Sequence, residues 1–146
     1  MLFTSFSSVG HSGKTDSILV SFNPDAIIDI LLNKTDWQPS VGLGESEQTS
    51  ELWAQILNNG SVQVDVDISA SIGPDWDLGS AAGHNITYLA YNIGSGNIEI
   101  TTSDLDFIND LAHNEYQTFG MWIDMPITSS TSVQQNITVT FTATAD

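Results

Sequence analysis

Acidic residues spaced two positions apart are the side chains of this sequence best suited to bind a metal ion. Four such pairs occur: Glu45 and Glu47, Asp65 and Asp67, Asp75 and Asp77, and Asp104 and Asp106. On a β-strand, residues i and i+2 share a face, so each pair presents two carboxylates to one site. Calcium takes about six to eight oxygen ligands. The best cluster consists of Asp104, Asp106 and Asp110. These three are the candidate calcium ligands, and ordinary solvated carboxylates are the alternative.

Residue types that catalyse reactions are present, but no catalytic motif joins them. His11, His84 and His113 lie far apart in the sequence and lack the spacing of metal ligands. No Gly-X-Ser-X-Gly sequence marks a serine nucleophile, and no carboxylate pair is singled out for glycoside hydrolysis. The sequence therefore predicts a protein that is not an enzyme and has no catalytic residues.

Two tryptophans are candidates for contacts with sugars or with other subunits. Along their predicted strands, Trp53 and Trp122 lie opposite the smaller apolar residues. An exposed indole ring can stack on a sugar or anchor an interface, whereas a buried one fills the core. Both interpretations stay open at this point.

Asparagine-linked glycosylation is the modification that the sequence indicates. Four Asn-X-Ser/Thr sequons occur, at Asn33, Asn59, Asn85 and Asn136. Asn59 lies in a predicted turn and Asn136 on the outward face of a predicted strand, while the other two lie at strand ends. These four are the candidate glycosylation sites of an extracellular protein.

A shortage of positive charge excludes several classes of function. The chain has 18 acidic residues but only two lysines and no arginine, which gives a formal net charge of −16. Nucleic-acid binders and proteins held electrostatically on anionic lipids need clustered lysine and arginine. The chain also has no cysteine and no run of the roughly 18 apolar residues that cross a membrane. We expect no nucleic-acid partner, no transmembrane segment, and an extracellular location with any signal peptide removed.

Alternation of apolar and polar residues dominates the chain and predicts β-strands. Residues 61–70 alternate valine or isoleucine with polar residues, and residues 136–145 alternate apolar residues with threonine. Further strands are predicted at residues 18–22, 26–32, 49–57, 86–91, 98–101 and 116–125. Asn58-Asn59-Gly60 predicts a tight hairpin turn into the 61–70 strand, and Gly94-Ser95-Gly96 predicts a second hairpin.

The elements predict an all-β fold. About eight or nine short strands in one chain favour a single antiparallel β-sandwich, either jelly-roll or immunoglobulin-like. Residues 104–113 fit either two turns of helix or a loop that contains one helical turn.

The N-terminal segment, residues 1–16, differs in character from the sandwich domain at 17–146. Leu2, Phe3 and Phe6 form a β-prone apolar group on a flexible leash. This group either folds back as an edge strand or pairs with a neighbouring subunit as a donor strand.

Residues 49–145 contain a series of motifs that resemble archaeal surface proteins and, more distantly, fibre-forming β-sandwiches of the camelysin and TasA type. The motifs are Asn58-Asn-Gly-Ser-Val-Gln-Val-Asp-Val-Asp-Ile-Ser-Ala70, Trp76-Asp-Leu-Gly79, Gly83-His-Asn85, Gln117-Thr-Phe-Gly-Met-Trp-Ile-Asp-Met-Pro126 and Gln135-Asn-Ile-Thr-Val-Thr-Phe-Thr-Ala-Thr-Ala145. The resemblance implies an extracellular structural protein. It also implies polymerisation by donor-strand exchange, for which Leu2–Phe6 is assigned by its role and not by a motif.

Together these observations favour a structural subunit of an extracellular filament, pilus or surface layer, with other copies of the same chain as its partners. One alternative is an adhesive sandwich that binds carbohydrate or calcium. The other is a capsid or spike sandwich of a virus.

Overall fold

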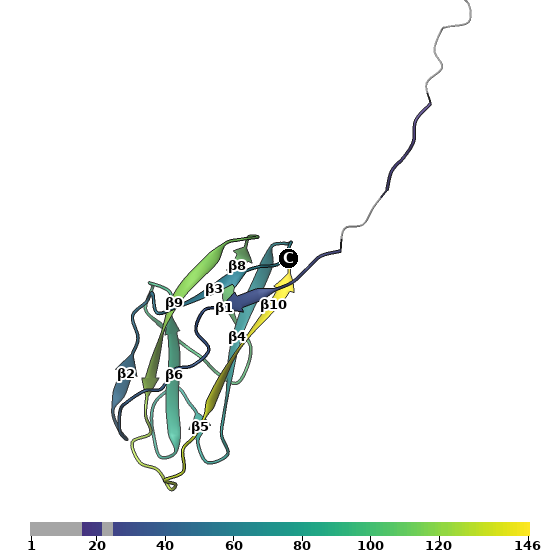
Figure 1. Cartoon of the computed structure of the whole chain (residues 1–146). Coiled ribbons are helices and arrows are strands. Elements are labelled where there is room, and N and C mark those ends of the chain that lie inside the picture. The colour runs from purple at the N-terminus through teal and green to yellow at the C-terminus, as the bar shows by residue number, and fades with distance from the viewer. Residues whose placement is uncertain (1–15, 22–24) are drawn as a thin grey trace, which may run out of the picture.

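The computed structural model describes residues 16–21 and 25–146, and its regular structure consists of strands. In chain order these are β1 (Ile30–Leu32), β2 (Ser46–Gln48), β3 (Ala54–Asn58), β4 (Val64–Ile72), β5 (Asp77–Leu78), β6 (Ile86–Asn92), β7 (Asn97–Glu99), β8 (Leu105–Leu111), β9 (Tyr116–Asp124) and β10 (Ile137–Ala145). The strands form two sheets in an elongated sandwich (Figure 1). The predicted all-β sandwich is therefore confirmed.

The larger sheet has seven strands and is centred on β9. Its main order is β1-β3-β9-β6-β5, with β2 also paired to β9 and β7 also paired to β6. On one edge of β9, β3 pairs with the first half of that strand and β2 with the last three residues. β6 covers the other edge. β1, with three residues, is an outer strand of this sheet.

The smaller sheet has the order β10-β4-β8, and both of its pairings are antiparallel. β10 pairs with β4 without interruption, from Ile137 opposite Ile72 to Ala145 opposite Val64. Because side chains alternate along a strand, the apolar residues of β10 and β4 all lie on the face toward the larger sheet.

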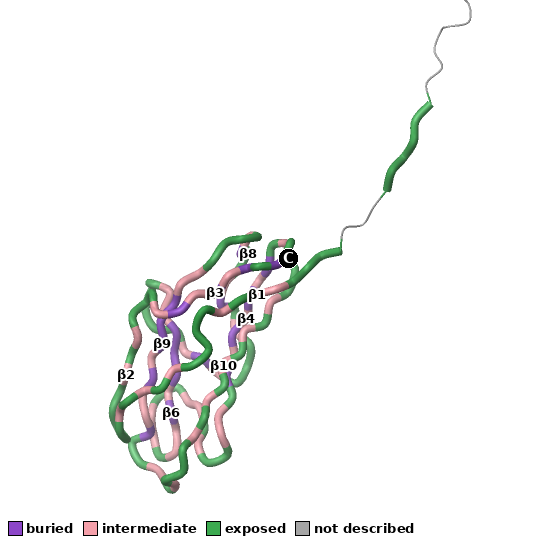
Figure 2. The backbone as a smooth tube through the Cα atoms, in the orientation of Figure 1, coloured by how far each residue is buried: buried purple, intermediate pink, exposed green. Residues whose placement is uncertain are grey.

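The core lies between the sheets and contains a chain of aromatic rings. Phe107 of β8 makes an edge contact with Tyr91 of β6 at a centroid distance of 4.9 Å and with Phe119 of β9 at 5.4 Å. Phe141 of β10 joins the same group, 5.1 Å from Phe107. Figure 2 shows that buried residues are concentrated along β4, β6 and β9. These contacts link both sheets through one core.

Several strand predictions are confirmed. β10 matches the alternating C-terminal run, and β9 directs Phe119, Met121 and Ile123 into the core, as its alternation predicts. β6 and β7 form the predicted hairpin around Gly94 and Gly96, both of which have positive φ. In each case the relevant pattern is local in sequence.

The predicted hairpin at Asn58-Asn59-Gly60 is wrong. The two flanking strands, β3 and β4, belong to different sheets, so the chain crosses from one layer to the other here. Asn58 is fully buried, and its amide nitrogen donates to the carbonyls of Val62 and Leu111, each at 2.8 Å. Its Oδ1 accepts from the Gly60 amide at 3.0 Å. This buried amide, and not a hairpin turn, fixes the crossing.

The helical interpretation of residues 104–113 is also wrong, because Leu105–Leu111 forms strand β8. The register between β8 and β4 shifts twice, between Val64 and Val66 and between Val66 and Asp67. A bulge inserts an extra residue and breaks the period-two pattern. The spacing that resembles a helix is therefore the signature of an irregular strand.

Two other strand predictions are wrong in whole or in part. Residues 18–21, the described part of the predicted 18–22 strand, belong to no sheet and are exposed, and of residues 26–32 only Ile30–Leu32 forms a strand. In the predicted 49–57 strand, alternation places Leu52 on the same face as the buried Ala54 and Ile56, but Leu52 is 76% exposed in a turn before β3. Leu2, Phe3 and Phe6 lie outside the described residues. Within residues 16–21 and 25–146, no helix has the length and apolar character to span a membrane.

Candidate functional site

The outer edge of β10 is an open sheet edge. Among the described residues, β4 is the one strand that pairs with β10. The amide of Gly73 donates to the Asn136 carbonyl at 3.0 Å, and the amide of Asp146 donates to the Gln63 carbonyl at 3.2 Å. Hydrogen-bonding direction alternates along an antiparallel strand. The even-numbered residues of β10 therefore bond to β4, and the odd-numbered residues direct their N–H and C=O groups to the open side.

The inward side chains of β10 are less covered than those of its neighbour. Val64, Val66 and Ile68 of β4 are completely buried, whereas Val139 and Phe141 of β10 are only half-buried, although they lie on the same face of the sheet. β4 has a strand on each side and β10 has one. An additional strand beside β10 would bury the half-exposed side chains of Val139 and Phe141.

A large groove runs along this uncovered edge. Its volume is about 1070 Å³, which is at or above the top of the range of about 300–1,000 Å³ for small-molecule pockets. The floor consists of core side chains of the larger sheet: Leu89, Phe119, Met121 and Ile123. One wall consists of β10 and the segment before it, residues 131–137, and the other of residues 34–39 with Leu32. A site of this size and apolar floor suits a peptide segment better than a small molecule.

Trp53 and Trp122 lie in different environments. Trp53 lines the groove beside Trp37, with ring centroids 6.1 Å apart and planes tilted by 55°. Trp122 is half-buried on the opposite face of β9 from the core residues, where its indole nitrogen donates to Asp124 Oδ1 at 2.7 Å. Of the two, Trp53 is the one placed to contact a molecule in the groove.

The two edges of the smaller sheet differ in how they resist further pairing. β8 carries Asp106 and Asp110 exposed at its surface, contains register shifts, and has Asp110 at a positive φ of 61°. Charges and bulges are the means by which proteins protect edges from pairing. β10, in contrast, has nine residues in regular register without charge, proline or glycine. Only the β10 edge of this sheet is suited to accept a strand.

Apolar side chains are also uncovered in residues 16–21, which precede the first strand of the sheets. Ile18, Leu19 and Val20 are 90%, 89% and 75% exposed. Figure 2 shows this segment as exposed and extending away from the sandwich. Three consecutive uncovered apolar residues leave considerable apolar surface in water, which burial in a groove would remove.

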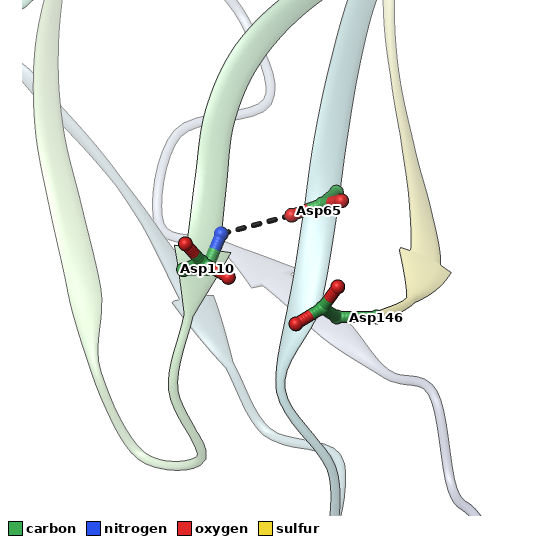
Figure 3. A group of neighbouring side chains, drawn as sticks. All are labelled: Asp65, Asp110 and Asp146. Atoms are coloured by element: carbon green, nitrogen blue, oxygen red, sulfur yellow. Dashed lines mark hydrogen bonds between the residues drawn. The ribbon is translucent and has the colours of Figure 1, made fainter.

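The structure brings one group of three carboxylates together, and it includes one of the predicted calcium ligands. Within the part of the chain that is described, the carboxylates of Asp65, Asp110 and Asp146 have oxygen atoms within 4.8 Å of one another (Figure 3). The amide of Asp110 donates to Asp65 Oδ1 at 2.9 Å. The side chain of Gln63 donates to Asp110 at 2.6 Å and to Asp146 at 3.1 Å, so an uncharged donor already serves two of the three carboxylates. Asp104 and Asp106 lie outside this group.

The four sequon asparagines differ in how their side chains are bonded. Asn33 is exposed, and its Oδ1 accepts from the Gln55 amide at 2.7 Å. Asn136 is exposed at the end of the groove. Asn59 donates from Nδ2 to Asp29 at 2.7 Å, and the half-buried Asn85 donates from Nδ2 to Ser130 at 2.7 Å. The nitrogen that would carry a glycan is thus already a hydrogen-bond donor at Asn59 and Asn85.

The pKa shifts of two tyrosines have structural causes. Burial raises the pKa of Tyr91 above 10.0, and the nearby Asp106 carboxylate raises it further. Burial, followed by the charges of Glu99 and Asp124, raises the pKa of Tyr88. Neither tyrosine lines the groove, so these shifts do not mark a reactive group there.

The alternation of residues 136–145 correctly predicts that Val139 and Phe141 face inward, but it does not predict that they are only half-buried. The alternation of β10 predicts which side chains face inward, but it does not show whether a strand lies on each side. The signal that was available is the uncharged, proline-free composition of Ile137–Ala145 in a chain with so many acidic residues.

Comparisons with known proteins assign this chain to no family. No family model matches the sequence, and no curated protein matches it. A chain from the solved structure of a chaperone-usher pilus, a study of how the pilus rod uncoils, is similar with 12% identity and a TM-score of 0.43. The match covers 94% of this chain and 97% of that one. At this level of similarity it carries no argument about function, which must rest on the groove itself.

Proposed function

We propose that this protein is a structural subunit of an extracellular filament, in which each copy inserts a β-strand from the part of its chain that precedes β1 into the groove of the next. The observation that carries the proposal is the open edge of β10. A regular, uncharged strand with half-buried Val139 and Phe141 borders a groove that reaches the core side chains of the larger sheet, and its outer main-chain donors and acceptors are not paired with another described strand. An inserted strand would bond to that edge and complete the sandwich.

The geometry of such a contact favours an open polymer. The donor is a strand that precedes β1 and the acceptor is the groove, so the two surfaces that meet are different. A head-to-tail contact between different surfaces produces either a ring or an open helical assembly. The described residues 16–21 lie extended and away from the domain (Figure 1), which suits contact with a following copy.

The charge of the chain constrains how copies hold together. Each subunit has a formal net charge of −16, so neighbours repel at long range. Main-chain pairing and apolar burial do not need opposite charges, and they are not weakened by salt. Assembly by strand insertion should therefore persist at high ionic strength and in the presence of a chelator. Loss of assembly in chelator would instead indicate bound cations as the source of cohesion.

Electron microscopy and sedimentation of the purified full chain test the proposal. We expect long fibres from the full chain and folded monomers after deletion of residues 1–21, since the sheets comprise residues 30–145. Closed shells would favour the capsid alternative. If the full chain stays monomeric at every concentration, the filament proposal is wrong and the adhesive module is favoured.

A further inference from the structure

We infer that the inserted strand is residues 17–21 of a neighbouring copy, with Ile18 and Val20 directed into the groove. The inference rests on the proposed function and specifies its partner segment. It places the donor strand directly after the N-terminal segment of residues 1–16, and not at Leu2–Phe6 within that segment.

The sequence of this segment complements the groove. Ile18 and Val20 are β-branched residues on one face of an extended chain, and Ser17 and Ser21 lie on the other with Leu19. β-Branched residues suit a strand. Residues 17–24 carry no charge. An uncharged segment can enter the apolar groove of a strongly acidic neighbour without placing a carboxylate in it.

The place where the chain enters the domain favours a second copy over the segment's own groove. The amide of Ile27 donates to Ser61 Oγ at 2.9 Å, and the Ser61 amide donates to the Ile27 carbonyl at 2.8 Å. This point lies at the end of the domain where β10 finishes, whereas the β10 residues that line the groove are Ile137, Val139 and Phe141. To occupy its own groove, the chain would have to reverse direction before Ile27.

Strand direction gives a second reason. A reversed segment would run parallel to β10, from the start of β10 toward its end. Both existing pairings of the small sheet are antiparallel, and parallel pairing is slightly less stable per residue. The segment of another copy is free to enter in the antiparallel direction.

The distance along the chain distinguishes this donor from Leu2–Phe6. Only residues 22–26 separate residues 17–21 from the anchored Ile27, and five residues span at most about 18 Å. A donor this close to its own domain holds consecutive subunits at a short, defined spacing. The twenty residues between Phe6 and Ile27, with their Ser- and Gly-rich stretch, would span up to about 70 Å and form a loose joint.

Paired substitutions in the full chain test the assignment. Ile18→Asp with Val20→Asp should raise the critical concentration for fibre formation by at least about 100-fold, because two buried apolar side chains become carboxylates. Ser17→Asp with Ser21→Asp adds the same charge on the other face of the segment and should change it by less than about tenfold. Equal effects of the two pairs would show that charge alone matters and would overturn the inference.

Two further results separate this inference from the proposed function. If the full chain forms no fibres, the proposed function fails. If fibres survive Ile18→Asp with Val20→Asp but disappear with Leu2→Asp and Phe6→Asp, the filament stands and the donor assignment is wrong. Circular dichroism confirms that each variant remains folded.

Disulfide trapping identifies the contacting copies directly, because the chain contains no cysteine of its own. A mixture of Val20→Cys and Val139→Cys single variants should give a disulfide-linked pair, while Leu19→Cys with Val139→Cys should give little. A double variant that closes efficiently into a cross-linked monomer would show the segment in its own groove. That result would contradict the second-copy assignment.

Discussion

Substitution of Val139 tests whether the groove beside β10 is the surface on which subunits assemble. Val139 is half-buried, lines the groove, and lies opposite the buried Ala70 of β4. Thr140 is the next residue and faces outward on the other side of the sheet. Val139→Asp and Thr140→Asp therefore add the same charge to the same strand on opposite faces.

The expected difference follows from what an inserted strand would cover. In the monomer, the new carboxylate at position 139 stays partly in water, and the loss of valine burial costs up to about 1.5–3 kcal/mol of unfolding free energy. In the filament, the inserted strand removes that water, and an unpaired buried charge costs several kcal/mol. A cost of about 4 kcal/mol corresponds to roughly a 1,000-fold rise in critical concentration.

Sedimentation across a concentration series measures the critical concentration, and urea unfolding of the monomer shows whether each variant retains its fold. Thr140→Asp should shift assembly by less than about tenfold, since its side chain stays in water and surface charges interact weakly. If Val139→Asp is too unstable, Val133→Asp at the rim is the substitute, because Val133 is already 66% exposed in the monomer. Equal effects of the inward and outward substitutions, in folded variants, would refute the groove as the assembly surface.

Three further predictions concern the sandwich itself. Thr87→Val should raise the unfolding free energy by about 1 kcal/mol in urea titration, because the completely buried Thr87 hydroxyl has no hydrogen-bond partner; a decrease would show that the hydroxyl is satisfied in solution. Tyr91→Phe should lower it by about 0.5–1.5 kcal/mol near pH 8, since the hydroxyl donates to the Asp106 carbonyl at 3.3 Å. The pKa of Tyr91 is raised above 10.0 in the folded state, so this tyrosine ionises first in the unfolded chain as the pH rises. The unfolding free energy of the wild type should therefore fall above pH 10, and its difference from that of Tyr91→Phe should shrink near pH 11. A difference in unfolding free energy that stays constant with pH would contradict this. Gly120→Ala should lower the unfolding free energy by about 1–3 kcal/mol in thermal or urea unfolding, since the new methyl group would lie 2.5 Å from the Ser50 carbonyl oxygen. An unchanged unfolding midpoint would show that the loop at Ser50 moves aside without cost.

The sequence alone determined the elements whose patterns are local. Alternation placed β10 at Ile137–Ala145, directed Phe119, Met121 and Ile123 of β9 inward, and glycines in the Gly94–Gly96 turn indicated the β6–β7 hairpin. Each of these follows from a few adjacent residues, because side-chain direction in a strand and positive φ in a turn are properties of the local backbone.

Only the tertiary structure decided how those strands are arranged. The chain crosses between the sheets at Asn58 and does not form a hairpin there. The hydrogen-bond partners of the Asn58 side chain include Leu111, which is distant in sequence. The bulge in β8 hid its alternation, since it depends on the register with β4. The groove exists because no described strand lies on the outer side of β10. A period-two pattern predicts which side chains of a strand face inward. Whether those side chains are fully buried depends on how many neighbouring strands flank it, which is a property of the whole fold.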